Sequence, residues 1–154
     1  MESARVVAWG RQLRRAHERL ADALVSARES IESGAPVAVP LPPLTYCSAF
    51  CTALDGHHRG EGSMLFPRVL ERHPELAEVV DNLSRDHTMI GHLLGDLRQS
   101  IDRGDPPDVV LRHLDGVEAV MTTHFRYEEK RLLGVLDGLS WDGVDPTEVF
   151  GPLA

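Results

Sequence analysis

The chain contains few aromatic residues, only two cysteines and no apolar run of the length needed to cross a membrane. Aromatic residues make up 5% of its 154 residues, so leucine, valine and alanine must form most of the core. Basic residues are outnumbered by acidic ones, and the formal net charge of −8 argues against nucleic acids and anionic membranes as partners. The first residues are polar rather than an apolar secretory segment, so we expect a cytoplasmic protein.

The two cysteines, Cys47 and Cys51, are four residues apart on a predicted helix. A helix does not point the thiols of such a pair at each other, so we expect two reduced thiols rather than a disulfide. Structural zinc sites with cysteine ligands usually have a second ligand pair, and the chain has no further cysteines.

Apolar residues recur at alternating spacings of three and four in four segments of the chain, which is typical of helices that pack in a bundle. The predicted helices cover residues 3–33, 44–66, 74–103 and 108–137. The prolines within residues 35–43 predict an extended linker, and Pro67 is expected to end or kink the second helix.

These segments predict an all-α fold, namely an antiparallel up-down-up-down four-helix bundle over residues 1–138. Residues 139–154 are expected to form a short irregular C-terminal tail, packed on the bundle or trailing from it, with Trp141 and Phe150 as its anchors. The sequence contains no strand pattern, no long internal repeat and no low-complexity tract.

Each predicted helix carries a histidine inside its apolar stripe, and two of these histidines are followed by a glutamate one turn later. The four histidines are His17, His57, His87 and His124, and the two glutamates are Glu61 and Glu128. Residues four apart share one face of a helix, so each pair can offer a nitrogen and a carboxylate to the same ion. Because unpaired buried imidazoles and carboxylates cost free energy, these side chains need partners, and a pair of metal ions would satisfy them.

The six side chains are also expected to lie at one height in the bundle. Counted from the two connections at one end of the bundle, they lie 13 to 20 residues along their helices, and a helix rises about 1.5 Å per residue. One zinc ion would leave some of these polar side chains without a metal to bind, whereas two iron ions would be coordinated by all six. The Glu-x-x-His spacing of ferritin-like sites is absent, so a nitrogen-rich di-iron site is favoured.

Five segments, taken in this order, resemble the haemerythrin-like, or HHE cation-binding, family. They are His17 in the first helix, HHRGE at residues 57–61, LFP at residues 65–67, DHTMI around His87, and HFRYEE around His124 and Glu128. Each segment is weakly specific alone, but their order and separations are specific together. The likeness covers about residues 10–137.

The resemblance implies a non-haem di-iron centre with an oxo or hydroxo bridge between the two Fe ions. The ligands it implies are His17, His57, Glu61, His87, His124 and Glu128, with both glutamates as bridges. One iron is expected to keep an open position for dioxygen, hydrogen peroxide or nitric oxide. Imidazole and carboxylate ligands also accept Zn or Mn, so the metal is not decided by the ligands alone.

The chain departs from the oxygen-carrying members of this family at one ligand. Those proteins have a fifth histidine one turn after the ligand of the third helix, and here that position is Gly91. His92 points about 140° away from His87 in a regular helix, and only a π-bulge would bring it inward. Either water or His58, which follows the second-helix ligand, could fill the gap. A more open iron suits reaction or sensing better than reversible oxygen storage.

Three functions remain open at this point. The favoured one is an enzyme, an oxidase, peroxidase or catalase-like protein that acts on dioxygen or hydrogen peroxide. The second is a sensor or store for oxygen, nitric oxide or iron without turnover, and the third is a bundle without metal. No motif identifies an organic substrate or a protein partner.

An apolar pocket for a diatomic molecule is expected beside the metals. The residues expected to line it are Leu20, Phe50, Ile90, Leu94 and Met121, all of which ordinary core packing would also explain. Glu18 and Glu129, by contrast, are expected to be exposed charges.

Overall fold

The computed structural model describes residues 8–33 and 43–154, and within these described residues it contains helices and no strand. The helices are α1 (Trp9–Glu32), α2 (Pro43–Gly60), α3 (Phe66–Arg72), α4 (Ala77–Asp102), α5 (Pro107–Asp137) and α6 (Pro146–Phe150). A π-helical turn, η1 (Glu61–Leu65), joins α2 to α3, and a 3-10 turn, η2 (Pro74–Leu76), precedes α4. The all-α class is therefore confirmed, while most of the predicted linker at residues 35–43 lies outside the described residues.

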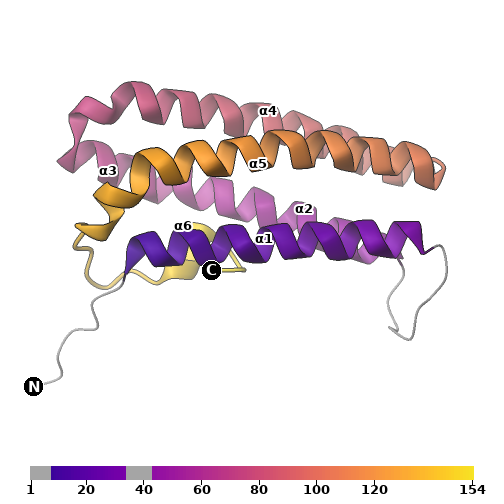
Figure 1. Ribbon diagram of the computed structural model, residues 1–154, viewed down its shortest axis with the longest axis horizontal. Helices are drawn as coiled ribbons and strands as arrows, with labels where there is room; N and C mark the ends of the chain where they lie inside the picture. Colours follow the sequence, from indigo (N-terminus) through magenta and orange to yellow (C-terminus); the bar gives the residue numbers. More distant parts are fainter. Residues whose placement is uncertain (1–7, 34–42) are drawn as a thin grey trace, which may run out of the picture.

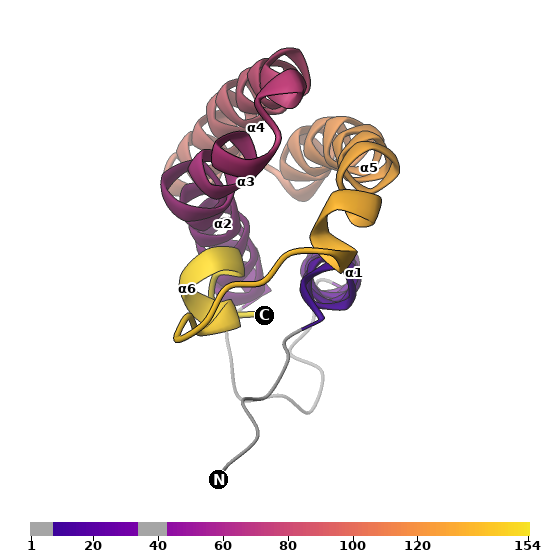
Figure 2. The same ribbon diagram turned by 90° about the vertical axis from the view of Figure 1, so that its left-hand side faces the viewer.

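The four long helices form a bundle. Figure 1 shows α1, α2, α4 and α5 side by side, with their axes running along the length of the molecule. Helix α1 packs against α2 and α5, and α4 packs against α5 and α2. Viewed along the helices in Figure 2, α6 lies beside α2 and close to α1. No helix of the described residues is long and apolar enough to cross a membrane.

The buried apolar residues of the bundle form two separate clusters, one toward each end. Along α1, for example, Leu13 and Ala16 belong to one cluster and Leu20 and Leu24 to the other, and His17 lies between them. Helix α4 changes cluster between Leu83 and Ile90, and α5 changes cluster between Phe125 and Leu132. Helix α2 belongs to one cluster, and the segment that follows it belongs to the other from Leu65 onward. The result is a polar layer enclosed between two apolar halves, which separates the buried histidines and glutamates from water.

The second predicted helix does not end at Pro67. Helix continues through the π-helical turn at Glu61–Leu65 into α3 and ends at Arg72. Pro67 lies in the first turn of α3 and has no backbone N–H to donate, so the chain must depart from the regular α-helical hydrogen-bond pattern just before it. Glu61 begins this wider turn, and π-helical turns of this kind occur frequently at functional sites.

The prediction of an irregular tail is wrong for residues 146–150, which form α6. Asp145 caps this helix, because its carboxylate accepts hydrogen bonds from the Thr147 backbone N–H at 2.9 Å and from the Thr147 hydroxyl at 2.7 Å. Pro146 occupies the first turn, where its missing N–H has no helical partner to lose. Trp141 and Phe150 both pack on Trp9 of α1, with ring centroids 5.3 Å and 6.1 Å away.

Both cysteines are buried free thiols on α2, as expected. Burial raises the pKa of Cys47 to about 12 and that of Cys51 to about 11. Both thiols therefore stay protonated at neutral pH, where they behave as small apolar groups of the core.

Candidate metal centre

Each long helix contributes a histidine to the polar layer of the bundle. His17 lies on α1, His57 on α2, His87 on α4 and His124 on α5, while Glu61 begins the π-helical turn after α2 and Glu128 lies on α5. The side chains of His57, Glu61 and Glu128 are fully buried, and His87 is the most open of the six at 12% exposure. The structure thus brings all six predicted site residues into one layer.

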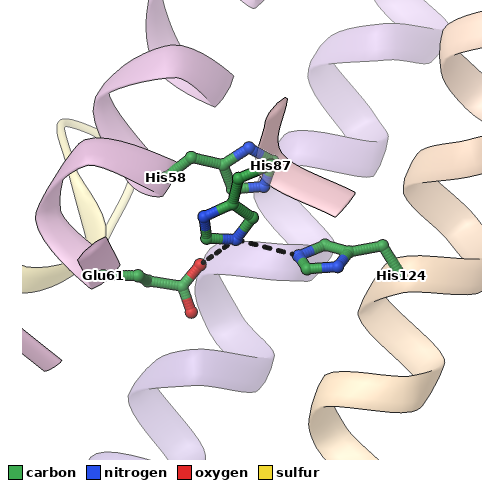
Figure 3. A group of neighbouring side chains, drawn as sticks. All are labelled: His58, Glu61, His87 and His124. Atoms are coloured by element: carbon green, nitrogen blue, oxygen red, sulfur yellow. Dashed lines mark hydrogen bonds and ion pairs between the residues drawn. The ribbon is translucent and has the colours of Figure 1, made fainter. Parts of the chain in front are cut away.

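The residues of the layer form two adjacent groups that could each hold a cation. One group is His58, Glu61, His87 and His124, and the other is His17, His57 and Glu128. Within each group, one ligand atom from every residue lies within 4.8 Å of the others. Figure 3 shows the four-residue group, with His124 facing the other two histidines from α5. The rings of His58 and His87 are stacked, and their centroids lie 3.8 Å apart. His58 therefore lies among the six predicted residues.

Glu61 lies close to histidines of both groups. Its Oε1 atom is 3.1 Å from Nε2 of His57, in the three-residue group, and 3.5 Å from Nε2 of His87, in the four-residue group. A carboxylate in this place can contact two neighbouring cations at once.

Glu128, on α5, also lies close to histidines of both groups. Its Oε1 atom lies 3.0 Å from Nε2 of His17, and its Oε2 atom lies 3.7 Å from Nε2 of His124. The two carboxylate oxygens of Glu128 thus face histidines of different groups, which is the placement that a bridging carboxylate requires.

Several inward-facing atoms of the layer are buried without a hydrogen-bond partner. They are Nε2 of His57, Nε2 of His58, both carboxylate oxygens of Glu61, and Oε2 of Glu128. His57 and Glu61 are close, but their contact does not have the geometry of a hydrogen bond. Each orphaned group carries a desolvation penalty, and cations between these atoms would remove it. The donor set therefore fits metal ions.

Three of the histidines are held from outside the layer through Nδ1. His17 bonds the Glu129 carboxylate at 3.1 Å, His57 bonds the Phe150 carbonyl at 3.0 Å, and His124 bonds the Asp86 carboxylate at 3.0 Å. Carbonyl and carboxylate oxygens accept, so each Nδ1 carries the proton and each Nε2 presents a lone pair to the layer. Such outer partners orient metal-binding histidines.

The sequence prediction missed these outer partners. Glu129 was expected to be an exposed charge, but it is half-buried because it contacts His17. Asp86 could have been noticed, since it directly precedes His87 in the DHTMI segment. The Phe150 carbonyl is a backbone atom, and no side-chain pattern could have indicated it.

The two buried glutamates have opposite pKa shifts. Burial raises the pKa of Glu128 well above its usual value, and the charge of Glu61 adds to the rise. Burial acts in the same direction on Glu61, but the neighbouring His57 and His87 outweigh it and hold the Glu61 pKa well below its usual value. Without metal, Glu128 therefore keeps its carboxyl proton to a higher pH than Glu61 does, and a bound cation would displace that proton.

Burial disfavours the protonated form of three imidazoles of the layer. It lowers the pKa of His17 and lowers that of His58 well below the usual value, and burial together with His87 lowers the pKa of His124 to about 4. Their Nε2 lone pairs are thus available at neutral pH, as metal binding requires.

The positions that could have supplied a further histidine from α4 do not face the layer. Gly91 is exposed, with open space where a Cβ would lie, and His92 is exposed on the same regular α-helix. The five apolar residues predicted to line a pocket, Leu20, Phe50, Ile90, Leu94 and Met121, are buried together in the cluster on one side of the layer.

A comparison with family models gives an independent line of evidence. Residues 11–136 match the model of the Hemerythrin HHE cation binding domain. The chain belongs to the haemerythrin HHE cation-binding family. Corresponding comparisons found no match among curated proteins and none among solved structures. Haemerythrin-type cation binding accords with the two donor groups, and the C-terminal tail lies beyond the matched residues.

Proposed function

We propose that this haemerythrin-family chain is a non-haem di-iron protein that activates dioxygen or hydrogen peroxide. The four-residue group would hold one iron, the three-residue group the other, and Glu61 and Glu128 would be shared between them. The observation that carries the proposal is the pair of adjacent donor groups in which several inward-facing atoms are buried without a hydrogen-bond partner. Zn or Mn would fit the same donors, so the choice of iron rests on the family.

His58, rather than water, would be the ligand that replaces the missing histidine of the third helix. Its Nε2 atom is buried without a partner, and its ring stacks on His87 with an interplanar angle of 11°. The four-residue group would then offer more protein ligands to its metal ion than the three-residue group. The three-residue group would keep more positions for an exogenous dioxygen, hydrogen peroxide or nitric oxide molecule.

Bound iron would supply cycling between ferrous and ferric states. The residues of the chain would orient the donors and exclude water. Phe125 stacks on His17 at 3.8 Å and closes one side of the three-residue group. Asp86 is 36% exposed and bonds His124, so it links the four-residue group to solvent. The apolar cluster beside the layer would provide a dry environment for a small molecule.

A sensor or store for oxygen, nitric oxide or iron is the second candidate. It is favoured by one observation: the C-terminal tail, which lies outside the matched family residues, contacts His57 through the Phe150 carbonyl. Such a contact could transmit the state of the metal centre to the surface of the molecule. A cytoplasmic location and the up-down-up-down connectivity remain predictions, and the packing of α1 against α2 and of α4 against α5 supports the connectivity.

The deciding experiment is metal analysis of anaerobically purified protein, with absorption spectra before and after addition of air or peroxide. Two irons per chain with near-ultraviolet and visible charge-transfer bands would support the di-iron centre. Consumption of peroxide far above the iron content would favour the enzyme, and an optical response without turnover would favour the sensor. Less than one metal per chain, or zinc with no spectral response, would contradict the proposal.

A further inference from the structure

The C-terminal tail, residues 139–154, contacts a histidine of the metal centre through a backbone atom. Nδ1 of His57 donates a buried hydrogen bond of 3.0 Å to the Phe150 carbonyl. The two rings are also stacked, with centroids 5.8 Å apart and an interplanar angle of 26°. Because the carbonyl can only accept, the tail determines which nitrogen of His57 is protonated and in which direction Nε2 points.

Two glycines let the tail and α2 approach each other at this point. A Cβ atom on Gly60 of α2 would overlap the Val149 carbonyl oxygen of the tail. On the tail side, Gly151 has φ +83°, and a Cβ there would lie 2.7 Å from the backbone nitrogen of His57. The backbone contact thus forms directly over the turn that carries His57, and a single added methyl group on either side would disturb it.

The rest of the tail is attached to the bundle along its length. Arg68 of α3 donates to the Ser140 carbonyl at 3.0 Å, Trp9 of α1 packs on Trp141 at 5.3 Å, and Arg19 of α1 donates to the Ala154 carbonyl at 2.8 Å. Figures 1 and 2 both place α6 alongside α1 and α2. The contact with His57 is therefore one of several contacts that hold the tail against the bundle.

We propose that the C-terminal tail is a strap that positions His57 and so controls how tightly the three-residue group retains its metal ion. The inference rests on the metal binding proposed above. This group has the fewer protein donors, so misorientation of one donor affects it most. Loss of an outer partner of a metal-bound histidine typically weakens metal affinity by roughly 10- to 100-fold. By linkage, a bound metal should in turn stabilise the docked tail.

Full-length Gly60→Ala and Gly151→Ala variants test the strap, with Gly134→Ala on α5 as the matched control, because a Cβ there meets nothing within 4 Å. The two tryptophans of the chain, Trp9 and Trp141, lie against each other at the tail, so their fluorescence reports docking without any metal. In the metal-free proteins, the two test variants should show red-shifted, more quenchable emission and the control should resemble wild type.

The second measurement is anaerobic release of ferrous ion to a chelator. One of the two ions should leave roughly 10- to 100-fold faster from both test variants than from wild type and the control. Nitrogen-15 histidine NMR of the metal-free protein should show His57 as a single Nδ1–H tautomer in wild type and as a mixture in the variants. The strap proposal would be overturned if the test variants had an undocked tail but released iron at the wild-type rate. It would also be overturned if release of both ions were accelerated equally.

Arg19→Ala provides a milder variant should either glycine variant fail to fold, since Arg19 is exposed and bonds only the end of the described tail. It should accelerate release in the same selective way but to a smaller extent, and release unchanged from wild type would again count against the strap. A wild-type protein that binds no iron would overturn the proposed function itself. Two irons in wild type with no effect in any variant would overturn the strap alone.

Discussion

At the scale of single residues, the two ring nitrogens of His17, His57 and His124 have different roles. Nδ1 bonds a partner outside the layer and Nε2 faces inward, as in His17, which bonds Glu129 on one side and Glu128 on the other. The outer bond orients the ring and selects the tautomer, so residues that never touch a metal should still determine its affinity.

Glu129→Ala should weaken metal binding to the three-residue group by roughly 10- to 100-fold, because His17 loses the acceptor of its Nδ1 proton. Glu129→Gln should recover part of the loss, since the amide oxygen can still accept. Competition titration with a chelator measures both. Glu18→Ala is the control, because Glu18 is an exposed residue of α1; equal affinities for the Glu18 and Glu129 alanine variants would contradict the assigned role.

His58→Ala distinguishes a histidine ligand from water at the gap in the four-residue group. If His58 is a ligand, metal content should fall from about two ions to about one per chain, because only Glu61, His87 and His124 remain in the group. His92→Ala, an exposed substitution on α4, should leave the content unchanged. Unchanged metal content in both variants would mean that water takes the place of His58.

At the scale of elements, the same residue type has different consequences on different helices. Gly95 on α4 faces open space, whereas Gly60 on α2 lies directly under the backbone of the tail. Helix propensity favours alanine at both positions, and tertiary contact decides which substitution the protein tolerates.

Gly95→Ala should therefore stabilise the protein by about 0.5–1 kcal/mol, because alanine loses less conformational entropy in a helix than glycine does. Gly60→Ala should be destabilising in spite of the same propensity gain, since its methyl group would displace the tail. Urea unfolding of the metal-free proteins measures both. A Gly60→Ala protein as stable as Gly95→Ala would show that the close approach of tail and helix is not required.

At the scale of the whole molecule, the polar layer stabilises the fold only when its charges are compensated. Two apolar clusters enclose it, and burial therefore penalises every unpaired charge in it. Metal binding and folding are for this reason thermodynamically linked in this protein.

The pH dependence of metal-free stability should expose this penalty at Glu128, whose folded pKa is raised well above the usual value. Above about pH 4.5 the unfolded chain loses this proton while the folded protein keeps it. The free energy of unfolding of the wild type should therefore fall by about 1.4 kcal/mol per pH unit until the pH passes the raised pKa. Glu128→Gln has no such proton to lose. The metal-free stability of Glu128→Gln relative to wild type should therefore increase as the pH rises. The control Glu78→Gln, at an exposed position, should show no such trend.

Denaturation of each variant across the pH range measures this difference. A stability difference between Glu128→Gln and wild type that is constant with pH would contradict the raised pKa. Glu128→Gln should also bind metal poorly, because it lacks a carboxylate ligand. The substitution would therefore raise metal-free stability and lower metal affinity.

Removal of metal by a chelator should lower the melting temperature, and renewed ferrous ion should restore it. A ligand at 100 times its dissociation constant adds about 2.7 kcal/mol to the stability of the folded state. Scanning calorimetry with and without chelator measures the shift. An unchanged melting temperature would favour the bundle without metal.

Local periodicity was sufficient to predict the main features of this protein. The all-α class follows from the 3.6-residue repeat that each helix expresses by itself. The common level of His17, His57, His87 and His124 was predicted from their distances along the helices to the connections. The family resemblance found in these segments is confirmed by the match over residues 11–136.

Tertiary structure alone decided the surroundings of these residues. The bond between His57 and Phe150, like the bond between His124 and Asp86, joins residues far apart in the sequence, and no local pattern encodes such a pairing. The inward place of His58 depends on how α2 packs against α4, because its ring stacks on His87 of α4. Sequence by itself therefore determined which side chains share a helix face, and packing between distant segments determined which atoms meet there, because contacts across the bundle exist only once the helices and the tail have docked.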